Sequence, residues 1–141
     1  MNPTDFSTLH KRAFASAARG WREEEFEQLL SDPNVIWAGD SRAFALARIA
    51  GDEAELLTLA CDPDHQRQGL AAACLTGLLE DASRRGVSRI FLDVAEDNQA
   101  ALRLYEKMGF ERAGMRRAYY RRADGASVDA FVFQKTLGQR A

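Results

Sequence analysis

The chain has 141 residues, of which 46% are hydrophobic and 28% are charged, and its net charge at pH 7 is −2. This length and balance predict one folded domain, residues 1–141, with one hydrophobic core. The near-neutral charge gives no reason to expect direct binding to nucleic acid, and no apolar stretch reaches the roughly 18 residues that a membrane-spanning helix needs.

The N-terminal part of the chain predicts two helices. Apolar residues recur at helical spacing from Phe6 to Ala17, with Thr4 as the expected N-cap and Gly20 as the expected stop. His10 lies on the apolar side of this helix, which favours a packed core histidine over a ligand. A second, shorter helix is expected over residues 22–30, where three glutamates in the first turn complement the helix dipole.

Three strands are expected next, and the third is the most apolar. Their predicted ranges are residues 34–38, 43–49 and 53–61, with turns at 39–41 and 51–52. In the third strand, alternation places one set of side chains on each face: Leu57, Leu59 and Cys61 on one, and Leu56, Thr58 and Ala60 on the other. Because both sets are nearly apolar, this strand should be central in the sheet and covered on both sides.

The second half of the chain alternates helices and strands. The expected elements are a helix over residues 70–85, a strand over 87–95, a helix over 99–108, and strands over 110–120 and 128–136. A strand–helix–strand unit requires parallel pairing, whereas the other strands should pair mostly antiparallel. The predicted fold class is therefore mixed α/β, a twisted and mostly antiparallel sheet with one parallel β-α-β crossover and flanking helices.

The two cysteines, Cys61 and Cys74, lie in apolar segments and are expected to be small buried side chains. Neither has the closely spaced Cys or His partners that a zinc site requires, so we expect neither a disulfide framework nor a metal site. Residues 1–9 are polar and lack the apolar core of a secretion signal. These features predict a cytoplasmic protein, and they do not indicate its oligomeric state.

The most informative segment is the polar run 63–71, between the third strand and the helix that begins at Leu70. A helix N-terminus offers unpaired backbone N–H groups and the positive end of the dipole, which together favour phosphate. Gly69 leaves room where a ligand would approach the backbone, and Arg67 adds a positive charge. We interpret the run as a pyrophosphate cradle, with a well-capped surface loop as the alternative. The three-glycine dinucleotide fingerprint and the P-loop ending are absent.

Two separated motifs resemble those of a known family. Residues 66–71, with the sequence Gln-Arg-Gln-Gly-Leu-Ala, follow the Gln/Arg-x-x-Gly-x-Gly/Ala pattern of the GNAT superfamily of N-acetyltransferases. Residues 98–110 resemble the second signature of that superfamily, N-x-x-A-x-x-L-Y-E-K-x-G-F. The resemblance extends from about residue 53 to residue 133. Within the superfamily it is closer to the bacterial ribosomal-protein-alanine acetyltransferases, on residues 53–60, 117–120, 124–125 and 129–130.

The resemblance implies acetyl-CoA as the acyl donor and assigns residues to it. Backbone groups of three strand residues would pair with the pantetheine arm like an added strand: Leu59, Ala60 and Cys61. Backbone N–H groups would hold the pyrophosphate at Arg67, Gln68, Gly69, Leu70, Ala71 and Ala72. The Asn98 side chain would bind the pantetheine amides. Ala71 stands where the family more often has a second glycine.

The resemblance also implies direct transfer of the acetyl group to an amine. Tyr105 would lie near the thioester sulfur and give a proton to the departing thiolate, with a purely structural core tyrosine as the alternative. Asp93 occupies the position of the proton acceptor, where close relatives have Glu, with an exposed strand acid of no catalytic role as the alternative. Because Asp is one methylene shorter, a bridging water, Glu53 and Glu55 stay open as alternatives.

The acceptor implied by the resemblance is a protein N-terminus, for example that of a ribosomal protein, and Tyr119 and Tyr120 would frame it. A small-molecule amine is the first alternative, and a non-catalytic module that binds acetyl-CoA is the second. Four arginines follow the second motif: Arg116, Arg117, Arg121 and Arg122. We interpret them as the solvated face of a strand, with a basic patch as the alternative.

Overall fold

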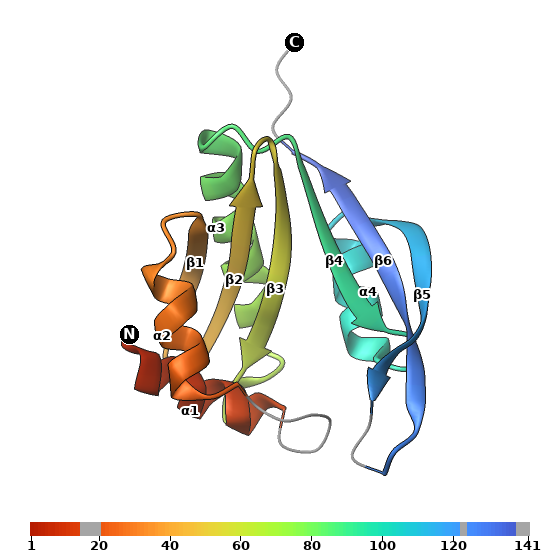
Figure 1. The fold of residues 1–141 in the computed structure, drawn as a ribbon, viewed down its shortest axis with the longest axis horizontal. Helices are drawn as coiled ribbons and strands as arrows, with labels where there is room; N and C mark the ends of the chain where they lie inside the picture. The colour runs from red at the N-terminus through yellow and green to blue at the C-terminus, as the bar shows by residue number, and fades with distance from the viewer. Residues whose placement is uncertain (15–20, 122–123, 138–141) are drawn as a thin grey trace.

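A six-stranded sheet organises the described part of the chain, residues 1–14, 21–121 and 124–137 of a computed structural model (Figure 1). The strand order is β1-β2-β3-β4-β6-β5. The strands are β1 (Val35–Asp40), β2 (Ala43–Ala50), β3 (Glu53–Cys61), β4 (Arg89–Ala95), β5 (Glu111–Arg121) and β6 (Ser127–Thr136). Neighbouring strands are antiparallel except β3 and β4, which are parallel. The predicted mixed α/β class is confirmed.

Helices cover both faces of the sheet. The described α-helices are α1 (Pro3–Ala13), α2 (Glu23–Ser31), α3 (Leu70–Arg84) and α4 (Gln99–Lys107), and a 3₁₀ turn, η1 (Pro63–His65), precedes α3. In Figure 1, α1 and α2 lie in front of β1–β3, whereas α3 and α4 lie behind the sheet. The front of β4, β6 and β5 has no described helix over it, so this half of the sheet presents an open face.

The first helix begins earlier than predicted. Asn2, not Thr4, is the N-cap: its side chain accepts a hydrogen bond from the Asp5 N–H at 2.8 Å, and Pro3 occupies the first helical position. The Thr4 hydroxyl instead donates to Glu23 of α2, at 2.6 Å. The expected continuation to Ala17 and the stop at Gly20 lie outside the described residues.

His10 is a core residue, as predicted. It is 4% exposed, its Nδ1 accepts a hydrogen bond from the Trp21 N–H at 3.0 Å, and its Nε2 lies 3.1 Å from the Thr58 hydroxyl. Since Nδ1 accepts, Nε2 carries the proton and donates to Thr58. The imidazole thus joins α1 to both β3 and the start of α2.

Local turn chemistry places most boundaries within two residues of their predicted positions. One turn is shorter than expected, because β1 continues through Asp40 and the turn predicted at 39–41 is confined to residues 41–42. The predicted strand 87–95 begins at Arg89. Ile90, Leu92 and Val94 alternate along this strand and are buried, so they share one face.

A β-bulge in β3 reverses the faces of this strand. Adjacent residues of β2 pair with Leu56 and with Thr58, so Leu57 lies between them without a partner. The simple alternation predicted for residues 56–61 is therefore wrong at the bulge. The observed faces are Leu56, Leu59 and Cys61 toward α3, and Leu57, Thr58 and Ala60 toward α1 and α2.

The parallel pair β3–β4 is short. Only residues 53–55 of β3 pair with residues 89–91 of β4, and beyond Glu55 the two strands diverge (Figure 1). The remaining parts of these two inner edges have no strand partner among the described residues. Backbone groups that are not paired in a sheet must find another partner, so the divergence creates a place where an extended ligand can bind.

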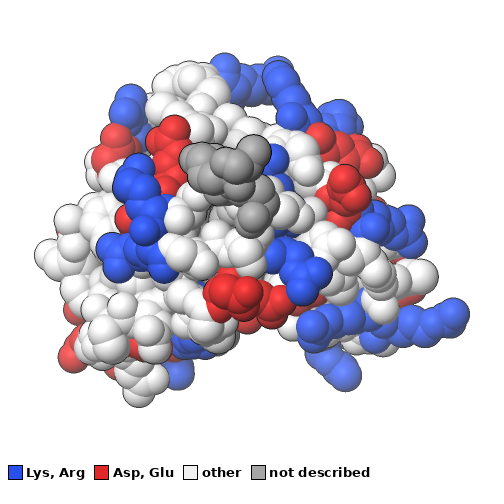
Figure 2. Space-filling view, turned by 90° about the horizontal axis from the view of Figure 1, so that it is seen from above, with Lys and Arg blue, Asp and Glu red and all other residues white. Residues whose placement is uncertain are grey.

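Charges of both signs are mixed at one end of the molecule (Figure 2). Figure 2 looks onto the end of the molecule that lies at the top of Figure 1, and it shows basic and acidic side chains beside one another there. Ion pairs such as Arg89–Glu53, at 2.8 Å, account for part of this mixing. None of the described helices has the length and apolar character needed to cross a membrane.

Replacing Phe6 by Ala should lower the free energy of unfolding by about 3–5 kcal/mol, because it leaves a cavity in the core under α1. Phe6 is fully buried, and its ring centroid lies 4.8–5.5 Å from those of Phe26, Trp37 and Phe44. Urea denaturation measures the change. Met115→Ala, at a position that is 45% exposed, serves as the control and should change stability by at most about 0.5 kcal/mol. Equal losses in the two variants would contradict the assignment of this core.

Candidate active site

The loop before α3 has the backbone geometry of an anion site. The N–H groups of residues 66–72 donate no hydrogen bond within the described part of the chain, and the first helical bond runs from Ala73 N to Gly69 O, at 3.0 Å. Arg67 and Gly69 both have left-handed backbone, with φ of 64° and 74°. Left-handed residues next to a helix start turn successive N–H groups into a concave array that binds anions.

Gly69 is required here for its conformation. A Cβ at this position would meet nothing within 4 Å in the protein, so crowding by neighbouring protein atoms does not demand glycine. Glycine is favoured here by the left-handed φ, which residues with a side chain adopt only at a cost in free energy. The room that we predicted for a ligand at Gly69 is thus present as open space in front of the backbone.

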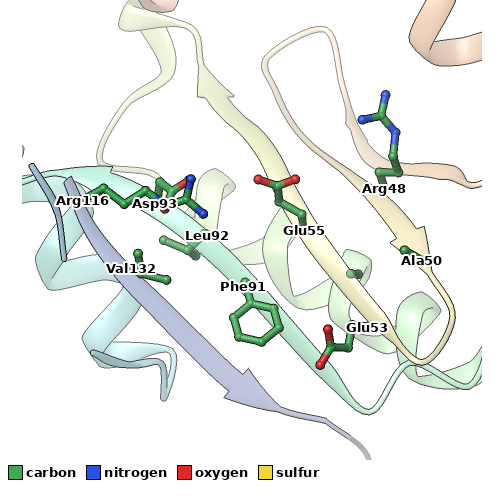
Figure 3. A pocket seen from close by; sticks show the side chains of 10 residues that line it. Arg48, Ala50, Glu53, Glu55, Phe91, Leu92, Asp93, Arg116 and Val132 are labelled. Atoms are coloured by element: carbon green, nitrogen blue, oxygen red, sulfur yellow. The ribbon is translucent and has the colours of Figure 1, made fainter. Parts of the chain in front are cut away.

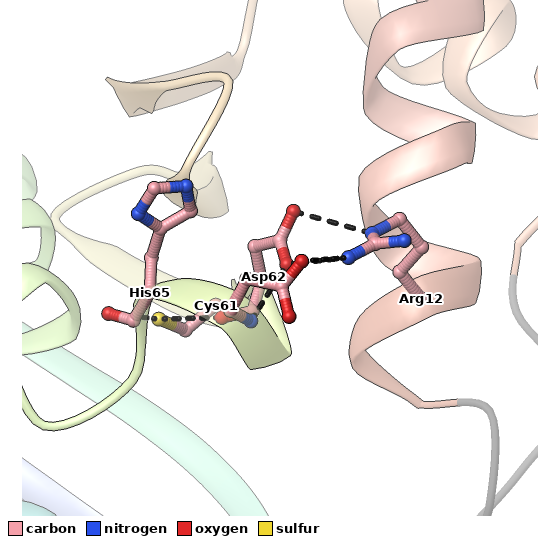
Figure 4. A network of polar contacts seen from close by, with 5 residues as sticks. Arg12, Cys61, Asp62 and His65 are labelled. Atoms are coloured by element: carbon pink, nitrogen blue, oxygen red, sulfur yellow. Dashed lines mark hydrogen bonds and ion pairs between the residues drawn. The ribbon is translucent and has the colours of Figure 1, made fainter.

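An ion-pair network fixes the first part of this loop to α1 (Figure 4). The Arg12 guanidinium contacts Asp62 at 2.9 and 3.2 Å and Asp64 at 3.0 Å. The Asp62 carboxylate also accepts from the Asp64 N–H, at 2.9 Å, and so caps η1. The hydrogen bond from Arg12 holds the pKa of the Asp62 carboxyl below its ordinary value of 3.8. We did not predict this clamp, because its partners lie 50 residues apart in the sequence.

The Cys61 thiol lies at the base of the same loop. Its Sγ is 3.6 Å from the carbonyl oxygen of His65 and 3.7 Å from that of Asp62. Burial, and then the negative charge of Asp62, raise the pKa of this thiol. Because only the thiolate is a strong nucleophile, Cys61 is poorly suited to carry an acyl group.

The diverging strands place the other predicted donor-site residues at one opening. Leu59 to Cys61 lie on the part of β3 that has no described strand partner toward β4. Asn98 is the N-cap of α4, and its Oδ1 accepts from the Ala101 N–H at 3.2 Å. This bond uses the carbonyl oxygen of the side chain and leaves its –NH₂ group as a donor for a ligand.

A charged pocket of about 300 Å³ lies on the open face of the sheet, where β3 and β4 begin to separate (Figure 3). Its charged lining residues are Arg48, Glu53, Glu55, Asp93 and Arg116. Figure 3 shows that these side chains come from β2, β3, β4 and β5, four different strands. The pocket therefore exists only once the whole sheet has formed.

Asp93 is the most enclosed acid of this pocket. Its side chain is 12% exposed, and Oδ1 lies 3.4 Å from Nε of Arg116. The rival acids differ from it: Glu53 forms an ion pair with Arg89 at 2.8 Å, and Glu55 is exposed. The sequence-based interpretation of Arg116 as part of a solvated strand face is incomplete, because its guanidinium reaches Asp93.

Tyr105 and Tyr120 lie near each other, whereas Tyr119 lies at the surface beside Tyr120. Tyr105 on α4 is 7% exposed, and burial, followed by the proximity of Tyr120, raises the pKa of its hydroxyl. Tyr120 donates from its hydroxyl to the backbone oxygen of Asp93, at 3.2 Å. Tyr120 therefore contacts Asp93 and lies near Tyr105. Tyr119 is 47% exposed and packs edge-on against Tyr120, with ring centroids 5.1 Å apart.

The remaining arginines of the C-terminal hairpin are distributed along β5. Arg112 stacks on the Phe131 ring, with its guanidinium carbon 3.8 Å from the ring centroid, while Arg117 and Arg121 are exposed. Arg122 lies outside the described residues. Among the described residues, no group of three His, Cys, Asp or Glu side chains is placed to hold a metal ion.

The sequence of this chain matches the model of a known protein family. The chain belongs to the acetyltransferase (GNAT) family, whose model matches residues 5–110. This agrees with the family suggested by the two sequence motifs.

Two bacterial proteins that are similar in sequence to this chain carry the same name. The chain is 46% identical over 94 residues to the [ribosomal protein bS18]-alanine N-acetyltransferase of Escherichia coli K12, a match that covers 67% of this chain and 63% of that protein. The chain thus spans somewhat less than two thirds of the length of this relative. With the enzyme of the same name from Salmonella typhimurium it is 45% identical over 132 residues, covering 89% and 87%.

Solved structures share the fold. The crystal structure of the ribosomal-protein-S18-alanine N-acetyltransferase from Escherichia coli superposes with a TM-score of 0.86 at 33% identity, covering 99% of this chain and 90% of that chain. Arabidopsis thaliana NAA60 in complex with acetyl-CoA superposes with a TM-score of 0.77 at 20% identity, covering 96% and 95%. The second similarity concerns the fold alone.

Replacing Arg12 by Gln should loosen the loop before α3. We expect backbone amide exchange in residues 62–69 to accelerate, and the Kd of coenzyme A to rise, each about two- to fivefold, as for the loss of an exposed ion pair. Lys11→Gln removes a neighbouring exposed charge of α1 and is the matched control.

The effect of Arg12→Gln should vary with pH only in the acid range, where Asp62 takes up a proton. Because the pKa of Asp62 is lowered in the folded protein, the contribution of the pair is complete above the ordinary value of 3.8 and is lost as the pH falls through the lower folded value. The difference between Arg12→Gln and the parent should therefore be constant from about pH 5 to pH 8. A difference that disappears within that range would contradict the clamp.

Proposed function

We propose that this chain is an acetyl-CoA-dependent N-acetyltransferase that acetylates the α-amine of a protein N-terminus by direct attack within a ternary complex. The observation that carries the proposal is the opening between β3 and β4, which has the unpaired amides of residues 66–72 at one end and the pocket around Asp93 at the other. A donor and an acceptor can therefore approach the same point from opposite sides. Membership of the acetyltransferase (GNAT) family supports this arrangement.

The described residues fit acetyl-CoA. The pyrophosphate would lie on the amides of residues 67–72, which have no other partner in the described part of the chain, and the pantetheine arm would lie along Leu59, Ala60 and Cys61 on the free edge of β3. The –NH₂ group of Asn98 would donate to the pantetheine amides. This placement brings the thioester to the region between Tyr105 and Asp93, where backbone N–H groups of β3 would stabilise the tetrahedral oxyanion.

The acceptor must arrive as a neutral amine. A protein α-amine has a pKa near 7.7–8.0, so roughly a tenth of it is neutral at pH 7, whereas lysine, near 10.4, is almost wholly charged. Acetylation of a protein N-terminus therefore needs a weaker proton acceptor than acetylation of a lysine side chain does. The short Asp93 side chain would suffice for such a substrate, directly or through one water.

In the transfer step, Asp93 receives the proton of the amine and the sulfur of coenzyme A receives the bonding electrons. The amine nitrogen forms a bond to the thioester carbon, and Asp93 takes the proton that the nitrogen loses. The carbon–sulfur bond then breaks, and the thiolate leaves with both bonding electrons. Because burial raises the pKa of Tyr105, this hydroxyl stays protonated and acts mainly as a hydrogen-bond donor to the leaving sulfur.

The acetyl group would pass directly from donor to acceptor. The one thiol on the described donor edge of β3 is that of Cys61, and its raised pKa disfavours the thiolate that an acyl-enzyme intermediate would need. Tyr119 and Tyr120 would border the path of the acceptor peptide, with Tyr119 on the outside. The names of the relatives support a ribosomal-protein N-terminus that begins with Ala as the acceptor.

Mass spectrometry of peptides mixed with acetyl-CoA and the protein tests the proposal. Peptides that begin with Ala or Ser and contain one internal Lys should gain one acetyl group at the α-amine, and copies with a blocked N-terminus should gain none. A parallel thiol-release assay uses a panel of polyamines, amino acids and amino sugars. Turnover with a small amine and none with peptides would replace the proposed acceptor. Tight binding of acetyl-CoA with no thiol release would indicate a non-catalytic module.

Replacing Asp93 by Asn should lower kcat about 100-fold and leave the Kd of acetyl-CoA within twofold. This loss is at the lower end of the roughly 10²–10⁴ that a positioned proton acceptor typically contributes, because part of an α-amine is already neutral. The residual rate should follow the ionisation of the peptide amine, near pH 8. Glu55→Gln is the matched control in the same pocket and should change kcat by less than about threefold. The opposite ranking of the two variants would make Glu55 the proton acceptor.

A further inference from the structure

β5 contains a wide bulge next to the candidate active site. Arg116 pairs with Ala130 of β6 and Tyr120 pairs with Val128, so a step of four residues on β5 faces a step of two on β6. Residues 117–119 form the extra loop of chain. At its centre, Ala118 has a φ of 51°, in the left-handed region that residues with a Cβ rarely adopt.

The bulge shortens the distance between two side chains that contact Asp93. At about 3.3 Å per residue, four residues of regular strand would span about 13 Å, whereas the two-residue step of β6 spans about 7 Å. Arg116 lies 3.4 Å from the carboxylate of Asp93, and the Tyr120 hydroxyl lies 3.2 Å from its backbone oxygen. Without the bulge, Arg116 and Tyr120 would lie too far apart along β5 for both side chains to contact Asp93.

β5 reaches Asp93 across β6, because β6 lies between β5 and β4 in the sheet. The β6 residue that faces both Arg116 and Ala95 of β4 is Ala130, which is fully buried. Its small side chain leaves room for longer side chains from β5 to pass over it. The geometry around Asp93 therefore depends on the backbone path of a strand that is not its neighbour.

One carboxylate holds the bulge in place. The Ala118 N–H donates to Oδ1 of Asp129, at 2.7 Å. Asp129 is itself fixed to the chain that follows β4, because its backbone oxygen accepts from the Glu96 N–H at 2.9 Å. A hydrogen bond of this kind stabilises the left-handed conformation of Ala118 against its conformational cost.

We propose that Asp129 is a positioning residue for acetyl transfer: by holding Ala118, it maintains the 117–119 bulge and so keeps Arg116 and Tyr120 on Asp93. This inference rests on the proposed function of Asp93. In this role Asp129 does not contact the substrate. Its effect on the reaction passes through the backbone of β5.

Kinetics of three variants test this role. Asp129→Ala should lower kcat about tenfold and raise the KM of an Ala-starting peptide, while the Kd of acetyl-CoA changes less than twofold. Asp129→Asn retains an acceptor oxygen at Oδ1 and should keep at least a third of the parent kcat. Asp81→Ala removes a carboxylate from α3, where it pairs with Arg85 at 3.1 Å, and should leave all these constants unchanged.

A second-site variant separates positioning from general damage. Glycine adopts left-handed backbone without the cost that Ala118 carries, so adding Ala118→Gly to Asp129→Ala should raise the kcat of that variant at least threefold. A purely structural role of Asp129 predicts no such rescue, because glycine adds no packing or hydrogen bond. Full activity of Asp129→Ala overturns the proposal. So does a result in which Asp129→Asn loses as much activity as Asp129→Ala and the glycine substitution rescues nothing.

Amide exchange at Ala118 distinguishes failure of this inference from failure of the proposed function. If no acceptor is acetylated even by the parent protein, the proposed function fails. The positioning role of Asp129 is then supported if protection of the Ala118 N–H is lost in Asp129→Ala and kept in Asp129→Asn. Unchanged protection in Asp129→Ala overturns it, whatever the activity.

Discussion

The short parallel pairing between β3 and β4 is the constraint on which the rest of this molecule depends. Parallel strands tend to stay together because each residue pair adds hydrogen bonds, yet these two strands separate after Glu55 and Phe91. The bulge at Leu57 lies two residues after the last parallel pair, and a bulge bends a strand and increases its twist. The separation leaves backbone groups on two inner edges for a ligand, and it opens the pocket toward the solvent-facing side of the sheet.

The two ends of this opening differ in how they are built. At the proposed donor end the groups are backbone amides of residues 66–72, and their directions depend on the conformations of Arg67 and Gly69 more than on side-chain identity. At the proposed acceptor end the groups are side chains from four strands, and their placement depends on the register of the whole sheet. Changes of sequence therefore alter the proposed acceptor end more readily than the proposed donor end.

Features encoded over a few neighbouring residues were predictable from the sequence. The polar loop, the helix that follows it and the capping residue Asn98 all depend on signals within one or two turns, and they appear where the motifs placed them. The contacts of Arg12 with Asp62 and of Arg116 with Asp93 were not predictable, because they join segments that only the folded sheet brings together. The bulges were missed for a related reason. Leu57 and Ala118 look like ordinary strand residues, and only the register of the partner strand makes them extra.

The irregular path of β5 has a consequence for the behaviour of the protein in concentrated solution. β5 is the last strand of the sheet, and an edge strand of 11 residues offers a row of backbone groups on which a strand of another molecule can add. The bulge interrupts this row, and the exposed guanidinium groups of Arg117 and Arg121 place like charges where a second copy would approach. The same distortion that shapes the pocket thus makes the outer strand a poor template for aggregation, and it does so through the strand's own backbone and charges.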